Sequence, residues 1–418
     1  MTICRSRLRG SLQAPPSKSY THRALFCSAL AQGESKLHSP LFCEDTLATS
    51  HALSKIGVTT EWNDGTACVS RSGEFKKPSD TIFCEESGTT LRFITAICAT
   101  TPHAADISGG PSLLKRPVKD LAVALRQLGA NCTSNQGYPP VHVRGPIRGG
   151  TVRIPGNVSS QHLSALLLAA PLAEMPVEIY VSGRLESKSY VQMTMDMQNK
   201  FGVRVDASDD MTRFRTAGER YHPSQTEIEG DWSSAGFLLV GATIAGEKVQ
   251  VHGLAEGSLQ ADRRLTRILK QMNGRVSQDS DSTTVEKSQL EPVEVDVSDC
   301  PDLFPAICAL CAMTDGLSTV RGIRRLRIKE SNRVQAMSNG LRQMGIRTKE
   351  SENSLIVHGG RPHKAVLNPN RDHRIAMAFA VLALCTDEAT IVDSECVAKS
   401  YPSFWSDLQL LGGRVTAG

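Results

Sequence analysis

The segment SSQHLSALLLAAP, residues 159–171, decides the fold, because it is one copy of a pattern that recurs along the chain. Small polar residues stand directly before a run rich in Ala and Leu, as expected for the capped start and buried body of a helix. Corresponding positions in successive copies lie 69 to 74 residues apart, which indicates six units of about 70 residues. The other copies are SKSYTHRALFCSALA from Ser17, ESGTTLRFITAICA from Glu86, SSAGFLLVGATIA from Ser233, PDLFPAICALCAM from Pro301 and DHRIAMAFAVLAL from Asp372.

A second signal runs in step with the first, a Leu-rich helix end closed by glycine and followed by a short β-branched stretch. Glycine just past a helix adopts the left-handed conformation that other residues resist. We therefore expect two helices in each unit, the second leading into a strand such as residues 203–205, and hairpin turns at glycine pairs such as Gly149-Gly150 and Gly359-Gly360. The six helix-ending glycines are Gly57, Gly129, Gly202, Gly274, Gly345 and Gly413.

Alternating strands and helices predict an α/β fold of six units. The chain has 418 residues, 40% of them apolar, and single cores stop growing well before this length. We therefore expect two domains of three units each.

Composition limits the function classes. The net charge is only +4, so no strong overall field attracts nucleic acid. Two basic clusters, RSRLR at 5–9 and RLRIK at 325–329, keep a nucleic-acid-processing protein open as an alternative, but only 5% of residues are aromatic, and grooves for nucleic acid normally combine basic with stacking side chains. Weak, salt-insensitive retention on a heparin column would exclude this alternative.

The cysteines and the apolar runs indicate the compartment. Twelve cysteines lack the spacing of a disulfide framework, and Cys308 and Cys311 stand in an apolar run that predicts buried helix packing rather than a metal site. Neither a signal peptide nor an apolar stretch of membrane-spanning length is recognisable. We expect a cytoplasmic protein, with no metal, cofactor or membrane partner.

The helix-opening segments carry more positive charge than capping requires. For any single copy, Ser, Thr and Asp are explained as N-caps. Several helix N-termini in one molecule could also form an anion site, and no P-loop motif occurs. The residues therefore predict a multiply anionic small-molecule substrate, held by cations among Lys18, Arg23, Arg92, His373 and Arg374.

Eight segments, spread over residues 14 to 402, resemble in order the motifs of the 5-enolpyruvylshikimate-3-phosphate (EPSP) synthases, or 3-phosphoshikimate 1-carboxyvinyltransferases. The segments are PPSKSYTHRAL, SGTTLRF, LLKRPVKDLAVALRQLG, VSSQHLSALLLAAP, SDCPDLF, RIKESNRVQAM, NRDHRIAMAF and AKSYP. The resemblance implies two inverted α/β barrels of three βαβαββ units, one formed by residues 1–12 plus 230–418 and the other by 13–229. Substrates would bind in the cleft between them, about a hinge that closes and expels water.

The resemblance also implies the reaction, transfer of the enolpyruvyl group of phosphoenolpyruvate to the 5-hydroxyl of shikimate 3-phosphate by addition and elimination, on the route to chorismate and aromatic amino acids. No cofactor is implied, and we expect a monomer. By resemblance, the phosphoenolpyruvate site comprises Lys18, Gly88, Arg116, Gln161, Arg333, Arg374 and Lys399. The shikimate 3-phosphate site comprises Lys18, Ser19, Arg23, Ser159, Ser160, Gln161, Ser187, Tyr190, Asp302 and Lys329.

The reaction needs a base and an acid. By resemblance, Asp302 accepts the hydroxyl proton, and Glu330 or Lys18 handles the proton at the methylene carbon. Taken singly, an arginine is more often a surface salt-bridge partner and an acid near a helix start is often only favourable capping. The joint placement within ordered motifs favours the active-site interpretation.

Two positions depart from the family pattern, in which Asn is frequent at Glu86 and near Arg325. Another carboxylate beside a phosphate site is unfavourable unless it points away or is paired. Gly88 leaves room beside the donor, so we expect glyphosate to inhibit the protein. A related alternative is the UDP-N-acetylglucosamine enolpyruvyl transferase, which usually has Lys-Asn at Lys18-Ser19 and a cysteine in the loop where residues 106–115 have none.

Overall fold

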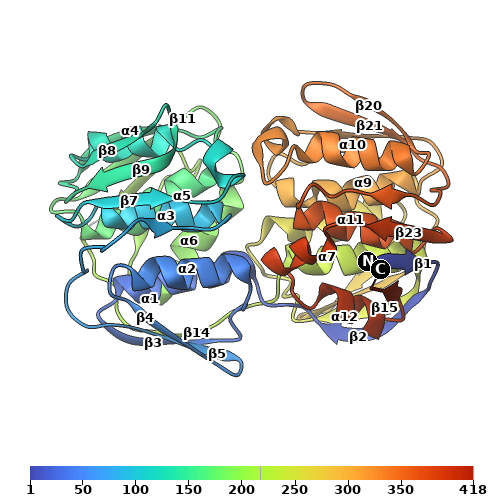
Figure 1. Ribbon diagram of the computed structural model, residues 1–418, viewed down its shortest axis with the longest axis horizontal. Coiled ribbons are helices and arrows are strands. Elements are labelled where there is room, and N and C mark those ends of the chain that lie inside the picture. The colour runs from blue at the N-terminus through green and yellow to red at the C-terminus, as the bar shows by residue number, and fades with distance from the viewer. Residues whose placement is uncertain (217, 418) are drawn as a thin grey trace. The chain divides into compact units, whose positions relative to one another are not determined.

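The computed structural model describes residues 1–216 and 218–417. The chain divides into two compact units, one formed by Met1–Pro15 with Glu229–Gly418 and the other by Pro16–Ile228. In Figure 1 the unit of residues 16–228 runs from blue to green. The other unit runs from yellow to red and includes the blue N-terminal strands.

Over the described residues, the strands form six four-stranded sheets, three in each unit, and all share one topology. In the sheet β10 (Gly150–Pro155), β11 (Val177–Ser182), β13 (Arg213–Thr216) and β12 (Val205–Ala207), the first two strands pair parallel and the other pairings are antiparallel. The same order recurs in the remaining sheets, which confirms the predicted α/β fold of repeated units.

The remaining sheets in the unit of residues 16–228 are β14 (Gln225–Glu227), β3 (Gly33–His38), β5 (Thr66–Arg71), β4 (Thr59–Asn63), and β6 (Ile82–Phe83), β7 (Ala105–Ser108), β9 (Tyr138–Arg144), β8 (Asn131–Asn135). Those in the other unit are β2 (Leu8–Gln13), β15 (Gly246–His252), β17 (Ser282–Glu286), β16 (Arg275–Gln278); β18 (Glu294–Asp296), β19 (Leu317–Arg321), β21 (Ser354–His358), β20 (Arg347–Glu350); and β22 (Val366–Leu367), β23 (Glu388–Ile391), β1 (Thr2–Cys4), β24 (Arg414–Thr416).

Each repeat contributes two helices, as predicted. They are α1 (Lys18–Leu30) and α2 (Glu44–Ser54), α3 (Gly88–Cys98) and α4 (Lys119–Gln127), α5 (Ser160–Ala169) and α6 (Lys188–Lys200), α7 (Trp232–Ala245) and α8 (Leu265–Gln271), α9 (Phe304–Ala312) and α10 (Arg333–Gln343), and α11 (His373–Ala383) and α12 (Phe404–Leu410). The short 3-10 turns are η1 (Leu113–Lys115), η2 (Ala170–Leu172), η3 (Ala261–Arg264), η4 (Pro301–Leu303), η5 (Arg324–Ile328) and η6 (Ser394–Lys399).

The first helix of each repeat lies inside its unit. Every residue of α7, α9 and α11 is buried, and these three helices contact one another at the centre of one core (Figure 1). A helix that is apolar on all sides is stable only when covered all round, which is why these Ala-rich and Leu-rich runs are central and the amphipathic second helices are peripheral. In the other unit, α1, α3 and α5 form the equivalent centre. The polar residues at the N-termini of these helices therefore lie at the end of each hydrophobic core.

Two strands far apart in sequence complete the first sheet of each unit. Strand β14 pairs with β3, and β2 pairs with β15. Where the chain passes from one unit to the other, Asp231 N donates to Pro15 O (2.7 Å) and Gly230 N donates to Gly253 O (3.1 Å). The first of these bonds joins the two crossover segments, and the second ties one of them to the residue that follows β15.

The helix-ending glycines are confirmed at four places, with φ of 88° at Gly57, 98° at Gly129, 83° at Gly202 and 82° at Gly345. The prediction was wrong for Gly274 and Gly413. There the left-handed residue comes one position earlier, at Asn273 (φ 62°) and Gly412 (φ 99°). Asn tolerates this conformation, and where two glycines are adjacent either can adopt it.

The predicted hairpin turns and one predicted strand were also wrong. The pair Gly149-Gly150 joins β9 to β10 and Gly359-Gly360 joins β21 to β22, strands of different sheets. These glycines permit close backbone approach, since a Cβ on Gly149 would lie 2.2 Å from Met175 O and one on Gly359 2.1 Å from Thr314 O. Strand β12 begins at Val205, because Val203 N still bonds to Gln198 O in the helix exit.

The twelve cysteines are free thiols, and Cys308 and Cys311 are buried in α9, as the packing interpretation predicted. Among the described residues, no helix is long and apolar enough to cross a bilayer.

Candidate active site

The polar starts of α1, α3 and α5 are N-caps and are also linked to one another. Ser17 Oγ accepts from Tyr20 N (3.4 Å), Ser87 Oγ from Thr90 N (3.3 Å) and Ser159 Oγ from Gln161 N (3.3 Å). Side-chain hydrogen bonds then join α1 to α2, α2 to α3 and α3 to α5 through His22–Thr49 (2.8 Å), Thr49–Thr90 (2.7 Å) and Gln161–Thr89 (2.9 Å). The capping interpretation is therefore correct, and the starts of α1, α3 and α5 lie in one hydrogen-bonded layer.

Two arginines border the start of α3. Arg92 donates through Nη1 to Gly88 O (3.0 Å) and to Gln161 Oε1 (3.0 Å), and through Nη2 to Pro117 O (3.1 Å). Arg116 is also buried, and its Cζ lies 2.7 Å from where a Cβ on Gly88 would stand. Gly88, Gln161 and Arg116, three of the residues that the resemblance implies for phosphoenolpyruvate, thus lie around the start of α3.

Lys18, the first residue of α1, pairs through Nζ with Asp45 Oδ2 at 2.7 Å, and both side chains are nearly buried. Buried charges need such partners, so Asp45 positions the Lys18 ammonium. No sequence motif marks Asp45, although its place at the start of α2 is a signal for an acid.

Arg23 lies deeper, and its hydrogen bonds join α1 to α6. It donates to Thr194 Oγ1 (2.9 Å), Ser19 O (2.8 Å) and Tyr190 O (2.8 Å). Burial lowers the pKa of its guanidinium to about 10. Ser160 and Ser187 are also buried, Ser160 as the first residue of α5 and Ser187 as the residue before α6, and Tyr190 is half-buried. Arg23 therefore holds the backbone of two predicted site residues.

In the other unit, Arg333 at the start of α10 contacts three carboxylates. Its Nη1 donates to Asp302 Oδ1 (2.7 Å), its Nη2 to Glu330 Oε2 (2.8 Å) and its Nε to Asp372 Oδ2 (2.8 Å). The guanidinium is 1% exposed, and despite burial these acids hold its pKa well above the usual range. These contacts use three of its five N–H donors.

Asp302 bridges Arg333 to Arg374, whose Nη2 lies 3.1 Å from Asp302 Oδ2. Burial opposes ionisation, but Arg374, Arg333 and then Lys329 outweigh it and hold the pKa of Asp302 well below its usual range. The carboxyl is thus ionised at neutral pH and able to accept a proton. The two lysines end 3-10 turns, Lys329 after η5 and Lys399 in η6, where Lys399 is buried.

Sequence reasoning missed two further acids. Asp372 caps α11 by accepting from Arg374 N (3.1 Å) and also binds Arg333; its place directly before His373 in a matched motif was a signal. Asp262 in η3 is buried, bonds to the Ser233 hydroxyl and has an unpartnered Oδ1. Burial, followed by repulsion from Asp302, raises the pKa of Asp262 to about 7. No sequence motif marked it.

The two departures from the family pattern are accommodated. Glu86 accepts hydrogen bonds from the segment that leads to Arg116, and Arg325 Nη2 donates to Ser298 O (2.7 Å).

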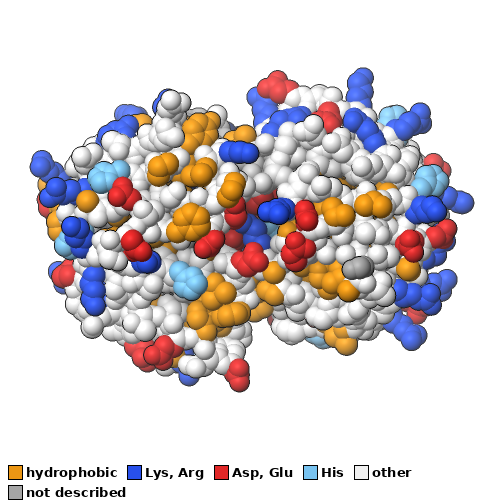
Figure 2. Space-filling view, viewed as in Figure 1, with side chains coloured by type: hydrophobic (Ala, Val, Ile, Leu, Met, Phe, Trp, Pro, Cys, Tyr) orange, Lys and Arg blue, Asp and Glu red, His pale blue; other side chains and the backbone are white. Residues whose placement is uncertain are grey.

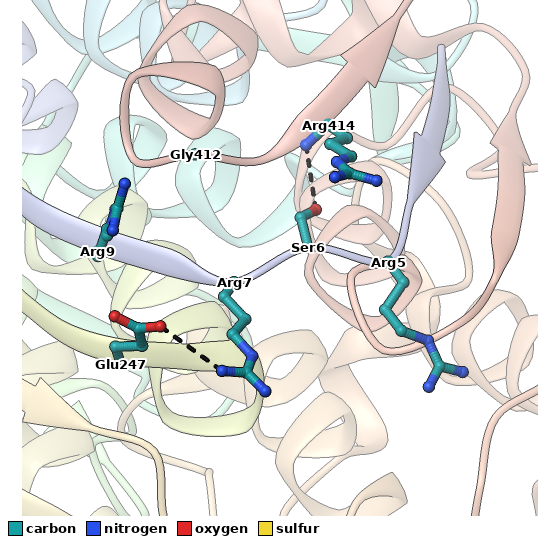
Figure 3. A pocket seen from close by; sticks show the side chains of 7 residues that line it. All are labelled: Arg5, Ser6, Arg7, Arg9, Glu247, Gly412 and Arg414. Atoms are coloured by element: carbon teal, nitrogen blue, oxygen red, sulfur yellow. Dashed lines mark hydrogen bonds and ion pairs between the residues drawn. The ribbon is translucent and has the colours of Figure 1, made fainter.

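The basic clusters are dispersed among acids. On the face shown in Figure 2, Lys and Arg are interspersed with Asp and Glu. The cluster RSRLR lines a pocket with Arg414 (Figure 3), where Arg7 pairs with Glu247 (3.6 Å), while Arg5 pairs with Asp387 (2.9 Å). None of the described residues lining that pocket is aromatic. This composition does not favour the nucleic-acid alternative.

Comparison with known proteins agrees with the geometry. A family model described as EPSP synthase (3-phosphoshikimate 1-carboxyvinyltransferase) matches residues 4–408. A 3-phosphoshikimate 1-carboxyvinyltransferase of Dehalococcoides mccartyi is 40% identical over 409 residues, 97% of each chain. One of Methanoculleus marisnigri is 40% identical over 401 residues, 94% of this chain and 95% of the relative.

Solved structures are similar over the full length. The EPSP synthase of Acinetobacter baumannii superposes with a TM-score of 0.83 at 27% identity, covering 100% of this chain and 99% of that one. The enolpyruvyl transferase NikO of Streptomyces tendae, at 16% identity and a TM-score of 0.81, shares the fold.

Proposed function

The chain belongs to the EPSP synthase family, and from this premise we propose that it transfers the enolpyruvyl group of phosphoenolpyruvate to the 5-hydroxyl of shikimate 3-phosphate and releases phosphate. The observation that carries the proposal is the family match over residues 4–408 together with relatives of that name at 40% identity over 97% of the chain. The resemblance seen in the sequence motifs is thereby confirmed at the level of the family.

Phosphoenolpyruvate and shikimate 3-phosphate bring two phosphates and two carboxylates, so their site must be strongly cationic. We assign Lys18, Gly88, Arg116, Gln161, Arg333, Arg374 and Lys399 to phosphoenolpyruvate. We assign Lys18, Ser19, Arg23, Ser159, Ser160, Gln161, Ser187, Tyr190, Asp302 and Lys329 to shikimate 3-phosphate. The buried arginine positions in each unit support this assignment, because a buried guanidinium keeps its fork fixed for bidentate anion binding.

We further propose that the two units are substrate-binding domains that close on the substrates about crossovers at residues 12–14 and 229–231. One unit then supplies Lys18, Arg23 and Arg116, and the other supplies Lys329, Arg333, Arg374 and Lys399. Closure would exclude water and strengthen every charge interaction with the bound anions.

In the proposed mechanism, Asp302 accepts the proton of the 5-hydroxyl while that oxygen bonds to C2 of phosphoenolpyruvate. Glu330 or Lys18 gives a proton to the methylene carbon, forming the tetrahedral intermediate. The same group then takes a proton back from that carbon while the bond between C2 and the phosphate oxygen breaks, which releases phosphate and the enolpyruvyl ether.

The environment of Asp302 suits a base that works only with substrate bound. Arg333 and Arg374 both bind its oxygens, which keeps it ionised but weakly basic. Anionic substrate would share these guanidinium groups, and its negative charge would raise the basicity of the carboxylate. The Asp302 carboxylate therefore stays deprotonated in the free protein and gains basicity when substrate binds.

Phosphate release from phosphoenolpyruvate tests the proposal, with shikimate 3-phosphate, UDP-N-acetylglucosamine or no acceptor. We expect release only with shikimate 3-phosphate. Release only with the nucleotide sugar would favour the related transferase, and no release with either acceptor would overturn the proposal. We also propose that the protein acts in the cytoplasm as a monomer, which sedimentation of the purified protein would check.

A further inference from the structure

The segment that carries Arg116 is a short loop with its own anchors. It runs from the end of β7 through η1 to the start of α4, and within it Leu114 N donates to Gly110 O (3.0 Å) and Arg116 N donates to Leu113 O (3.0 Å). Leu113 is fully buried, but this single apolar contact does not fix the direction of the long Arg116 side chain, which has several rotatable bonds. The polar contacts at the two ends of the loop must do so.

Glu86 binds the N-terminal end of this loop. Its Oε1 accepts from Ser112 N (3.3 Å), and its Oε2 accepts from Leu113 N (3.0 Å) and from the Ser112 hydroxyl. These are charge-assisted hydrogen bonds to the start of a 3-10 turn, where backbone N–H groups lack partners inside the turn. A Cβ on Gly110 would lie 2.3 Å from Glu86 Oε1, so the loop leaves space for this carboxylate.

The backbone around Glu86 is shaped for this contact. Glu85 has φ of 48°, a left-handed conformation that is unfavourable for a non-glycine residue. Its carbonyl accepts from Gly110 N at 2.7 Å, which joins the same two segments a second time. Strain of this kind persists where surrounding contacts impose it.

The other end of the loop is held from α3 and α5. Arg92 Nη2 donates to Pro117 O (3.1 Å), and the buried His162 ring of α5 lies next to the same carbonyl. Burial, followed by Arg92, lowers the pKa of His162 to about 3, so the ring is neutral and adds no charge beside the arginines. Arg116 thus stands between one anchor at Ser112 and another at Pro117.

We propose that Glu86 is a positioning residue that clamps the loop of residues 109–117 and thereby aims Arg116 at the phosphoenolpyruvate beside Gly88. It acts through Arg116 and does not touch the substrate. This explains why an acid is tolerated next to an anion pocket, because its charge is directed into backbone N–H groups. The inference rests on the proposed function, since it assigns a role within the same site.

Kinetics of Glu86→Ala, Glu86→Gln and Ser112→Ala test the proposal, with Glu178→Ala as a control that removes a partly exposed carboxylate paired with Arg213 in the same unit. We expect Glu86→Ala to raise KM for phosphoenolpyruvate at least roughly tenfold, while kcat and KM for shikimate 3-phosphate stay within about threefold. Gln keeps one of the two acceptor oxygens, so it should restore part of the loss. Ser112→Ala should raise the same KM less than Glu86→Ala, and the control should match the wild type.

Amide hydrogen exchange adds a readout that needs no activity. Exchange at both Ser112 and Leu113 should accelerate in Glu86→Ala, whereas Glu86→Gln keeps one acceptor oxygen and should accelerate exchange at only one of the two. The proposal is overturned by equal increases in both KM values, by an unchanged KM for phosphoenolpyruvate, or by unchanged exchange. If Glu86→Ala does not fold, Ser112→Ala decides by the same selectivity. A wild-type protein without activity would instead refute the proposed function, while exchange would still test the clamp.

Discussion

Gly88→Ala tests the closeness of Arg116 to the start of α3. The new Cβ would stand 2.6 Å from Arg92 Nη1 and 2.7 Å from Arg116 Cζ and Nη1. Ordinary non-bonded contacts are about 3.5–4.0 Å, so both guanidinium groups must move by about 1 Å. All three atoms are at the ends of long side chains, so we expect the fold to survive.

Misplacing a substrate-positioning group by this distance costs up to about 100-fold in rate, so kcat/KM for phosphoenolpyruvate should fall roughly 10- to 100-fold. Inhibition by glyphosate should weaken markedly as well. Steady-state phosphate release measures both, with Gly257→Ala as the control, because a Cβ there meets nothing within 4 Å. Wild-type kinetics together with equal glyphosate inhibition in Gly88→Ala would refute the reasoning.

Asp302→Asn removes the proposed base, so kcat should fall about 10²- to 10⁴-fold while calorimetry still detects shikimate 3-phosphate binding; wild-type turnover would contradict the assignment. Asp372→Asn breaks a buried pair with Arg333, and denaturant melts should show a loss of about 3–5 kcal/mol, whereas no loss would mean that the pair is dispensable. Burial and then repulsion from Asp302 raise the pKa of Asp262 from 3.8 to about 7. Between about pH 4 and pH 7 the folded protein therefore holds a proton at Asp262 that the unfolded chain releases. The free energy of unfolding consequently falls as the pH rises through this range. Melts at pH 5 and pH 8 should therefore show Asp262→Asn gaining stability relative to the wild type at the higher pH, and a pH-independent difference would refute this.

The repeat architecture was predictable because apolar segments that recur at a fixed interval in the sequence become buried helices at the same interval in the fold. Apolar runs such as residues 159–171 recur at a fixed interval, and each folds as a central helix. The errors concern local backbone geometry. Asn273 competes with Gly274 for the left-handed position, and the close approach at Gly149 depends on Met175, which lies 26 residues later. Neither is visible from local pattern alone.

Among the charged groups of the site, those in sequence motifs were predictable, and those whose role depends on tertiary contacts were not. Arg333 and Asp302 were found because they stand in ordered motifs, and the structure shows them in contact. Asp262 was missed, since its importance comes from burial beside Asp302 and not from its neighbours in sequence. Glu86 was noticed as a departure, but its partners in the loop of residues 109–117 are set by a tertiary contact across some 26 residues.

A crystal structure of the protein with shikimate 3-phosphate and glyphosate bound tests the central claim most directly. We expect both ligands in one closed site, with hydrogen bonds to glyphosate from Lys18 and Arg116 of one unit and from Arg333 and Arg374 of the other. Ligands bound to one unit alone, with the arginines of the other unit still engaged only with their own carboxylates, would contradict the account.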